Sequence, residues 1–206
     1  MKVVAFGNTD LVGNKNAPYY LAKKLNYNFE DCSTESSGPQ SIFRIVTKYA
    51  ASNSDFMPVI GWNNVKSIEL RKVFKKEKYT GFIDPNFFTY GTDKNVDFEF
   101  RRLEKWKHIL TDDYLTNIRW CTLVLSLQQL LESYNIPYLM YNIDTSIDWN
   151  EYTMNIIKNI NRKTYIGVEN PKANMRKYVK KLGYNFYSAE GQKCAANLLY
   201  EKMESK

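Results

Sequence analysis

Apolar and polar positions alternate along this chain in blocks that predict buried strands followed by amphipathic helices. Residues 2–6 and 56–60 form short, almost continuously apolar runs, and each run stops at a glycine. Such runs are typical of strands that are buried on both faces of a parallel sheet. Between them, residues 41–51 carry apolar side chains at helical spacing. Strands and helices that alternate in this way indicate an α/β domain.

The second half of the chain continues this alternation. The longest predicted helix covers residues 112–134, and its broad apolar face leads into a predicted strand at 136–141. A helix between two parallel strands makes a right-handed crossover. Further helices are expected at 18–25, 148–161 and 189–203, and a short strand at 164–168. The pattern predicts one domain over residues 1–206, a three-layer αβα sandwich with a mostly parallel sheet.

Residues 62–111 are the least regular part of the chain, and we expect a less regular insertion there. A basic segment at 65–76 has a helical pattern, and a second amphipathic helix is expected at about 97–110. Between them, residues 79–91 form a loop rich in Gly, Pro and aromatic residues. Long loops inside compact domains usually have a role, so this one is a candidate lid or interaction surface.

The composition changes this picture little. Hydrophobic residues make up 44% of the 206 and charged residues 25%, which is ordinary for a globular protein. No apolar run approaches the roughly 20 residues that cross a bilayer, and the first strand begins without a signal-peptide pattern. We therefore expect a cytoplasmic protein without membrane association. Cys32, Cys121 and Cys194 are far apart and odd in number, which favours reduced thiols over disulfides or zinc.

The net charge of +7 raises the question of an anionic partner. Basic residues cluster in two stretches, 71–78 and 172–181, and 15% of the residues are aromatic. Together these features permit binding to nucleic acid through phosphates and stacked bases. Basic runs also occur as solvated helix faces, and no recognition motif organises these residues. Nucleic acid is therefore one alternative partner.

Short motifs with candidate chemistry follow the predicted strands, at the edge where open parallel sheets bind ligands. They are Gly7-Asn8-Thr9-Asp10 after the first strand, Gly38 before the second helix, and Gly61-Trp62-Asn63-Asn64 after the next strand. These motifs resemble those of the SGNH/GDSL hydrolase superfamily, especially the small SGNH-like proteins of bacteriophages. The resemblance implies an SGNH-hydrolase or flavodoxin-like fold. It also implies a nucleophile position at Thr9 and an oxyanion hole formed by Gly38 and Asn63.

The last motif of that family is Asp-x-x-His ahead of the final helix, and this chain departs from it. The glycine that opens the helix matches Gly191, but residues 184–187 contain neither aspartate nor histidine. Gln192 stands where some members carry an additional histidine, and an amide cannot act as a general base. The sole histidine is His108, on a predicted helix. Because a hydroxyl nucleophile needs an adjacent base, losing that base typically costs several orders of magnitude in rate.

Three hypotheses follow. The first is a non-hydrolytic SGNH-like protein that binds a small polar or anionic ligand, or a host macromolecule, through its basic surface or through Gly7, Asn8, Thr9, Gly38, Asn63 and Asn64. The second is a hydrolase or transferase for ester, acyl or glycan-like substrates, with Thr9 as nucleophile and Asp10 or His108 as base. The third is a nucleic-acid-associated protein. The sequence has no phosphate loop, dinucleotide fingerprint or metal-ligand cluster, so we expect neither cofactor nor metal.

Overall fold

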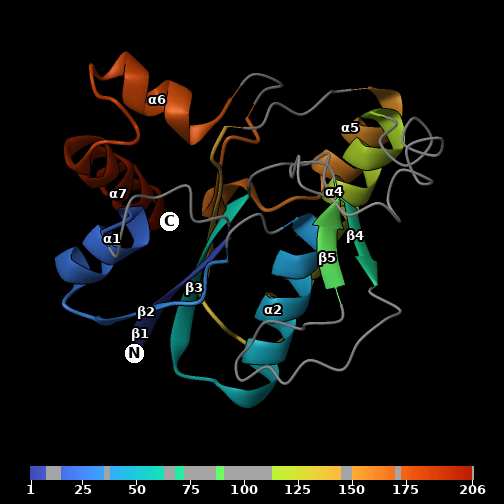
Figure 1. The fold of residues 1–206 in the computed structure, drawn as a ribbon, viewed down its shortest axis with the longest axis horizontal. Helices are drawn as coiled ribbons and strands as arrows, with labels where there is room; N and C mark the ends of the chain where they lie inside the picture. The colour runs from blue at the N-terminus through green and yellow to red at the C-terminus, as the bar shows by residue number, and fades with distance from the viewer. Residues whose placement is uncertain are drawn as a thin grey trace.

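A five-stranded parallel sheet forms the centre of the molecule (Figure 1). The computed structural model describes residues 1–7, 15–34, 38–62, 68–71, 87–90, 113–144, 150–169 and 173–205. The strand order is β2-β1-β3-β6-β7, and every neighbouring pair is parallel. The strands are β1 (Lys2–Gly7), β2 (Asn28–Asp31), β3 (Phe56–Trp62), β6 (Leu139–Asn142) and β7 (Tyr165–Ile166). The predicted α/β class and parallel sheet are confirmed.

Helices cover both faces of the sheet and make the three-layer sandwich (Figure 1). One layer contains α1 (Ala17–Leu25), α6 (Met175–Lys181) and α7 (Ala189–Glu204). The other contains α2 (Pro39–Ser52), α4 (Asp113–Ser133) and α5 (Glu151–Ile157). None of the helices in the described ranges is long and apolar enough to cross a membrane.

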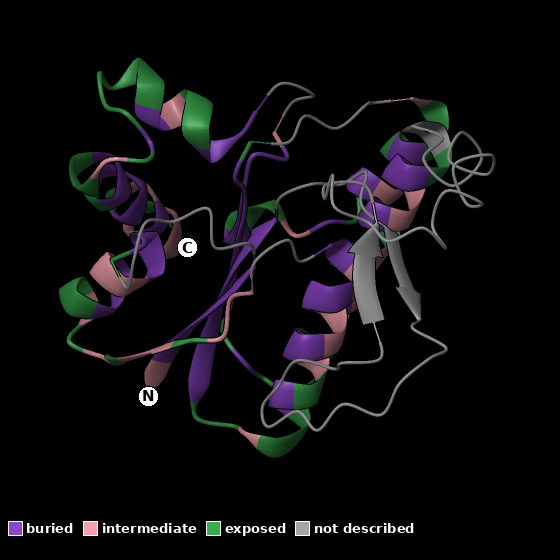
Figure 2. Ribbon diagram, in the orientation of Figure 1, coloured by how far each residue is buried: buried purple, intermediate pink, exposed green. Residues whose placement is uncertain are grey.

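The alternation of side chains along the strands divides the core in two. In β1, Val4 and Phe6 pack with α2 and α4, whereas Val3 packs with α1 and α7. All three are at most 3% exposed, and burial of such a side chain contributes about 1.5–3 kcal/mol. Figure 2 shows the result, with buried residues along the strands and on the helix faces that meet them. Both faces of the central strands are therefore covered, as their continuous apolar runs predict.

The edge strand β2 is held to its neighbours by a polar cluster around Glu30. The Lys2 ammonium and the Tyr49 hydroxyl both donate hydrogen bonds to the Glu30 carboxylate, and the Cys32 thiol lies 3.5 Å from it. Burial alone would raise the pKa of Glu30, but these hydrogen bonds outweigh it and lower the pKa. Burial also raises the pKa of Cys32 to about 12, so its thiol stays protonated. The cluster connects β2 to β1 and α2, and it lies just before the segment that leads to Gly38.

The middle of the chain differs from the sequence prediction. The helix expected at 65–76 is wrong, because Ile68–Arg71 forms strand β4 and pairs antiparallel with β5 (Phe87–Tyr90). Aromatic residues and threonine in β5 favour a strand, and the pairing outweighs the weak helical period of β4. The second helix expected there, at about 97–110, lies outside the described residues.

Candidate functional site

The strand order predicts a ligand-binding crevice at the carboxyl ends of β1 and β3. From β1 the chain crosses to β2 on one side and later returns to β3 on the other side. In open α/β sheets, ligands bind at the position where the order reverses in this way. The register brings Gly7 of β1 opposite Gly61 of β3 at this position. The motif that starts at Gly7 and the motif that starts at Gly61 therefore begin side by side.

Both glycines are required by the closeness of the chains. Gly7 has φ +132°, and a Cβ atom built on it would lie 2.2 Å from the Gly61 carbonyl oxygen. A Cβ atom on Gly61 would lie 2.9 Å from the Tyr141 hydroxyl oxygen. Real Cβ atoms do not approach backbone so closely, so a side chain at Gly7 would force the strands apart. The Tyr141 ring occupies the space that Gly61 leaves.

The start of α2 lies at the same edge of the sheet and, among the described residues, has no side-chain cap. Gly38 is the N-cap residue of α2 and has no side chain that could accept a hydrogen bond, and Pro39 follows it without an N–H group. The segment leading to Gly38 is tied to β1, because the Thr34 N–H donates to the Gly7 carbonyl at 3.0 Å. An uncapped helix start attracts negative charge. The placement agrees with an anion-stabilising role for Gly38, which stays a prediction.

The other predicted site residues cannot be placed in the same way. Gly7 and Gly38 lie in the described part of the chain. The remaining candidates lie outside the described residues, and their roles stay predictions: Asn8, Thr9, Asp10, Asn63, Asn64 and His108.

The turn before α7 occupies the place where the SGNH resemblance implies the aspartate and histidine. Here the Asn185 side chain accepts a hydrogen bond from the Tyr187 N–H at 3.1 Å, and Ser188 caps α7 by accepting from the Gly191 N–H at 3.0 Å. A Cβ atom on Gly191 would lie 1.8 Å from the Asn185 carbonyl oxygen, so the helix packs tightly on the turn. The polar side chains of this turn hold backbone groups and provide no carboxylate or imidazole.

Gln192 has a structural role that sequence reasoning missed. Its side chain is 4% exposed, and its Oε1 atom accepts a hydrogen bond from the Ala17 N–H at 2.9 Å. Its Nε2 atom donates to the Phe186 carbonyl oxygen. The amide thus joins the start of α1 to the turn before α7. The residues it connects are far apart in sequence, so no local pattern could have indicated this role.

Arg176 is a second residue that sequence reasoning did not assign to the site. The Ile143 N–H donates to the Trp62 carbonyl at 2.9 Å, and the Arg176 N–H donates to the Ile143 carbonyl at 3.0 Å. These two bonds connect the end of β3 to the first turn of α6. The Arg176 guanidinium donates to Asp144 at 2.6 Å and lies 5.3 Å from the centre of the Tyr187 ring. A cation therefore stands at the carboxyl edge, next to the turn that lacks a base.

The phenols below this edge are neutral. Burial raises the pKa of Tyr141 and Tyr165 well above that of a free phenol. The Tyr165 hydroxyl donates to Asn142 Oδ1 at 2.6 Å, and Asn142 Nδ2 donates to the Gly167 carbonyl at 2.6 Å. Within the described ranges, no three His, Cys, Asp or Glu residues are grouped as a metal site would need. Below the described edge, these polar groups are bonded to one another, and at the edge itself Arg176 forms an ion pair with Asp144.

No protein-family model matches the chain, and no curated protein matches it. A solved structure that resembles it comes from Desulfitobacterium hafniense DCB-2, a protein provisionally assigned to the lipolytic G-D-S-L family. The two chains are 12% identical, and the alignment covers 98% of each with a TM-score of 0.46. A similarity at this level carries no argument about activity.

We expect alanine at Gly7 to destabilise the protein strongly. A Cβ atom would meet the Gly61 carbonyl, so Gly7→Ala should lower the free energy of unfolding by about 3 kcal/mol or more. Gly183→Ala is the control, because Gly183 also has positive φ (+88°) but has no atom within 4 Å of the added Cβ. That change should cost only about 1 kcal/mol. Equal losses for both variants in urea denaturation would contradict a close contact between β1 and β3.

We also expect the buried amide of Gln192 to be needed for stability. Gln192→Leu would leave the Ala17 N–H and the Phe186 carbonyl without partners, at a cost of about 2–5 kcal/mol. The control is Asn197→Ala on the same helix, where an exposed side chain accepts from Lys24 and the change should cost about 0.5 kcal/mol or less. Thermal and urea unfolding measure both. A Gln192→Leu variant as stable as the control would show that the amide does not tie α1 to α7.

Proposed function

We propose that this chain binds a small polar or anionic ligand at the carboxyl ends of β1 and β3 and does not hydrolyse it. The observation that carries the proposal is the turn at residues 185–188. There the SGNH resemblance implies the aspartate and histidine of a triad. In this chain, the Asn185 side chain accepts a hydrogen bond from the Tyr187 N–H, and the Tyr187 ring packs against Phe186. The described residues of this turn include no base, which favours binding over hydrolysis.

The described groups at this edge support a ligand with negative charge or a carbonyl oxygen. The uncapped start of α2 at Gly38 presents backbone N–H groups and the positive end of a 14-residue helix. Arg176 adds a guanidinium beside the end of β3, and Asp144 accepts from one of its nitrogens. Because a guanidinium has five N–H donors, it can hold Asp144 and still bind an anion.

We also propose an evolutionary origin for the chain. We propose that the chain is an SGNH-like protein of the kind that bacteriophages encode, which kept the glycine framework of the pocket and lost the triad. Gly7, Gly38 and Gly61 support this, because each stands at a strand end or helix start where the resemblance requires a glycine. Thr9 then contacts the ligand and does not attack it.

Ester hydrolysis tests the proposal. Wild type and Thr9→Ala should hydrolyse p-nitrophenyl acetate and p-nitrophenyl butyrate at the same rate, within about twofold of the buffer background, because no base activates the hydroxyl. Circular dichroism of both proteins controls for folding.

The competing hypothesis is a hydrolase or transferase with Thr9 as nucleophile. It predicts turnover by wild type that disappears in Thr9→Ala, and loss of the same turnover in His108→Ala or Asp10→Ala without unfolding. That result would overturn a purely binding role, and the variant that loses activity would identify the base.

A further inference from the structure

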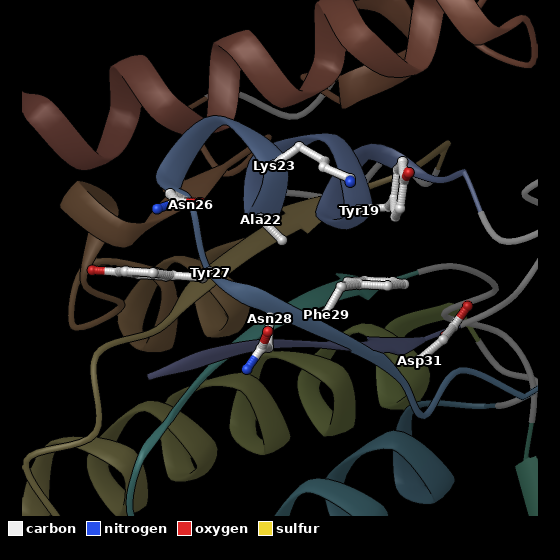
Figure 3. Close-up of a pocket in the computed structure, with 8 residues that line it drawn as sticks. All are labelled: Tyr19, Ala22, Lys23, Asn26, Tyr27, Asn28, Phe29 and Asp31. Atoms are coloured by element: carbon white, nitrogen blue, oxygen red, sulfur yellow. The ribbon is translucent and has the colours of Figure 1, made fainter.

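A cavity lies between α1 and the edge strand β2. It has a volume of about 620 Å³ and is lined by the rings of Tyr19, Tyr27 and Phe29 (Figure 3). The Tyr19 and Phe29 rings meet edge to face at 5.5 Å between centroids. Lys23 reaches toward the same space from α1, whereas the Asn28 side chain points to the other side of β2 (Figure 3). The cavity thus combines aromatic walls with a cation.

The aromatic walls stay accessible because β2 is at the edge of the sheet. Only β1 pairs with β2 among the described strands. Tyr19, Tyr27 and Phe29 are accordingly half-buried, whereas aromatic side chains below the central strands, such as Phe56, are fully buried. Aromatic surface left open beside polar groups is typical of a binding site.

Lysines and tyrosines continue this surface across the seam where α1 packs on α7. Lys23 lies 5.7 Å from the Tyr19 ring centre. On the α7 side, Lys24 lies 4.2 Å from Tyr200, and Lys193 lies 5.6 Å from Tyr20. The Tyr19 and Tyr20 rings are in contact at 5.3 Å, so the aromatic surface runs from the cavity to the seam.

The lysines of this surface, Lys23, Lys24 and Lys193, have no ion-pair partner among the residues that the structure describes. Lys24 donates to the neutral Asn197 amide at 2.9 Å. Asp31 is the one acidic residue that lines the cavity, and its oxygens accept from the Asn16 side chain and the Ser33 N–H, neutral donors that do not cancel its charge. In a chain with net charge +7, such a surface attracts polyanions.

We infer that the α1–β2 cavity and the α1–α7 seam bind a single strand of nucleic acid. An unpaired base enters the cavity and stacks on its rings, while the lysines of the seam contact the phosphates. Alternating rings and cations fit a ligand in which planar bases alternate with anions. The cavity excludes a duplex, whose bases are stacked inside the helix. Asn26 also lines the cavity, and its amide offers donors and an acceptor to the edge of a base.

The lysines are tested with a matched pair of double variants. Fluorescence anisotropy of fluorescein-labelled oligo(dT) and oligo(U) gives the affinity of the full-length protein over a range of salt concentrations. Lys23→Gln with Lys24→Gln should reduce the slope of log K against log salt by about 1.4, because two phosphate contacts are lost. Lys180→Gln with Lys181→Gln removes the same charge from the last turn of α6 and should leave the slope unchanged. Equal losses in both double variants would overturn the inference, since net charge alone would then explain binding.

The cavity is tested by removing its rings. Phe29→Leu and Tyr27→Leu keep apolar side chains but remove stacking, and each should weaken oligonucleotide binding about 10-fold. Near-ultraviolet circular dichroism shows whether each variant keeps its packing, and either folded variant suffices for the test. Unchanged affinity in a folded variant would overturn the inference, as would equally tight binding of a duplex of the same length. None of these variants changes a residue of the carboxyl-edge site, so failure here leaves the proposed ligand site untouched.

Discussion

The contact between Gly7 and Gly61 is the constraint on which the rest of the carboxyl edge depends. Gly7 has φ +132°, so a Cβ atom there would meet the Gly61 carbonyl oxygen at 2.2 Å, and the Tyr141 ring fills the space that Gly61 leaves. Because the strand order reverses here, the segments that follow the two strands begin side by side. The ends of β3 and β6 are then linked onward to α6 by backbone hydrogen bonds through Ile143. A short contact between two glycines thereby sets the geometry of the candidate site.

The helix starts around this edge differ in a way that bears on function. Asn16 caps α1 and Ser188 caps α7, and the Gln192 amide joins these two starts. The start of α2 at Gly38 lacks a side-chain cap. Capping satisfies backbone donors inside the protein, so an uncapped start leaves donors for a ligand. In the described residues, the turn that would carry a catalytic base in an SGNH hydrolase holds backbone groups, whereas the start of α2 has no side-chain cap. This difference is the physical basis of the proposed binding role.

Periodicity predicted the parts of the fold that bury continuous apolar surface. The strands β1 and β3 and the helices α2 and α7 lie where the pattern placed them, because each buries residues at the expected spacing. The strand β2 was missed because its four residues contain one apolar side chain, and α6 was missed because it is short and basic. The motif glycines Gly7 and Gly61 could be predicted because each directly follows an apolar run, a pattern visible in the neighbouring sequence. The roles of Gln192 and Arg176 could not, because their partners lie elsewhere in the sequence.

A crystal structure of the protein as purified, refined with attention to the carboxyl ends of β1 and β3, tests the central claim most directly. The account predicts an open crevice at Gly7 and Gly61, with density for a polar or anionic molecule within hydrogen-bond distance of the first N–H groups of α2. A crevice closed by the protein's own side chains, with the α2 start bonded to them, would contradict a ligand site at this edge.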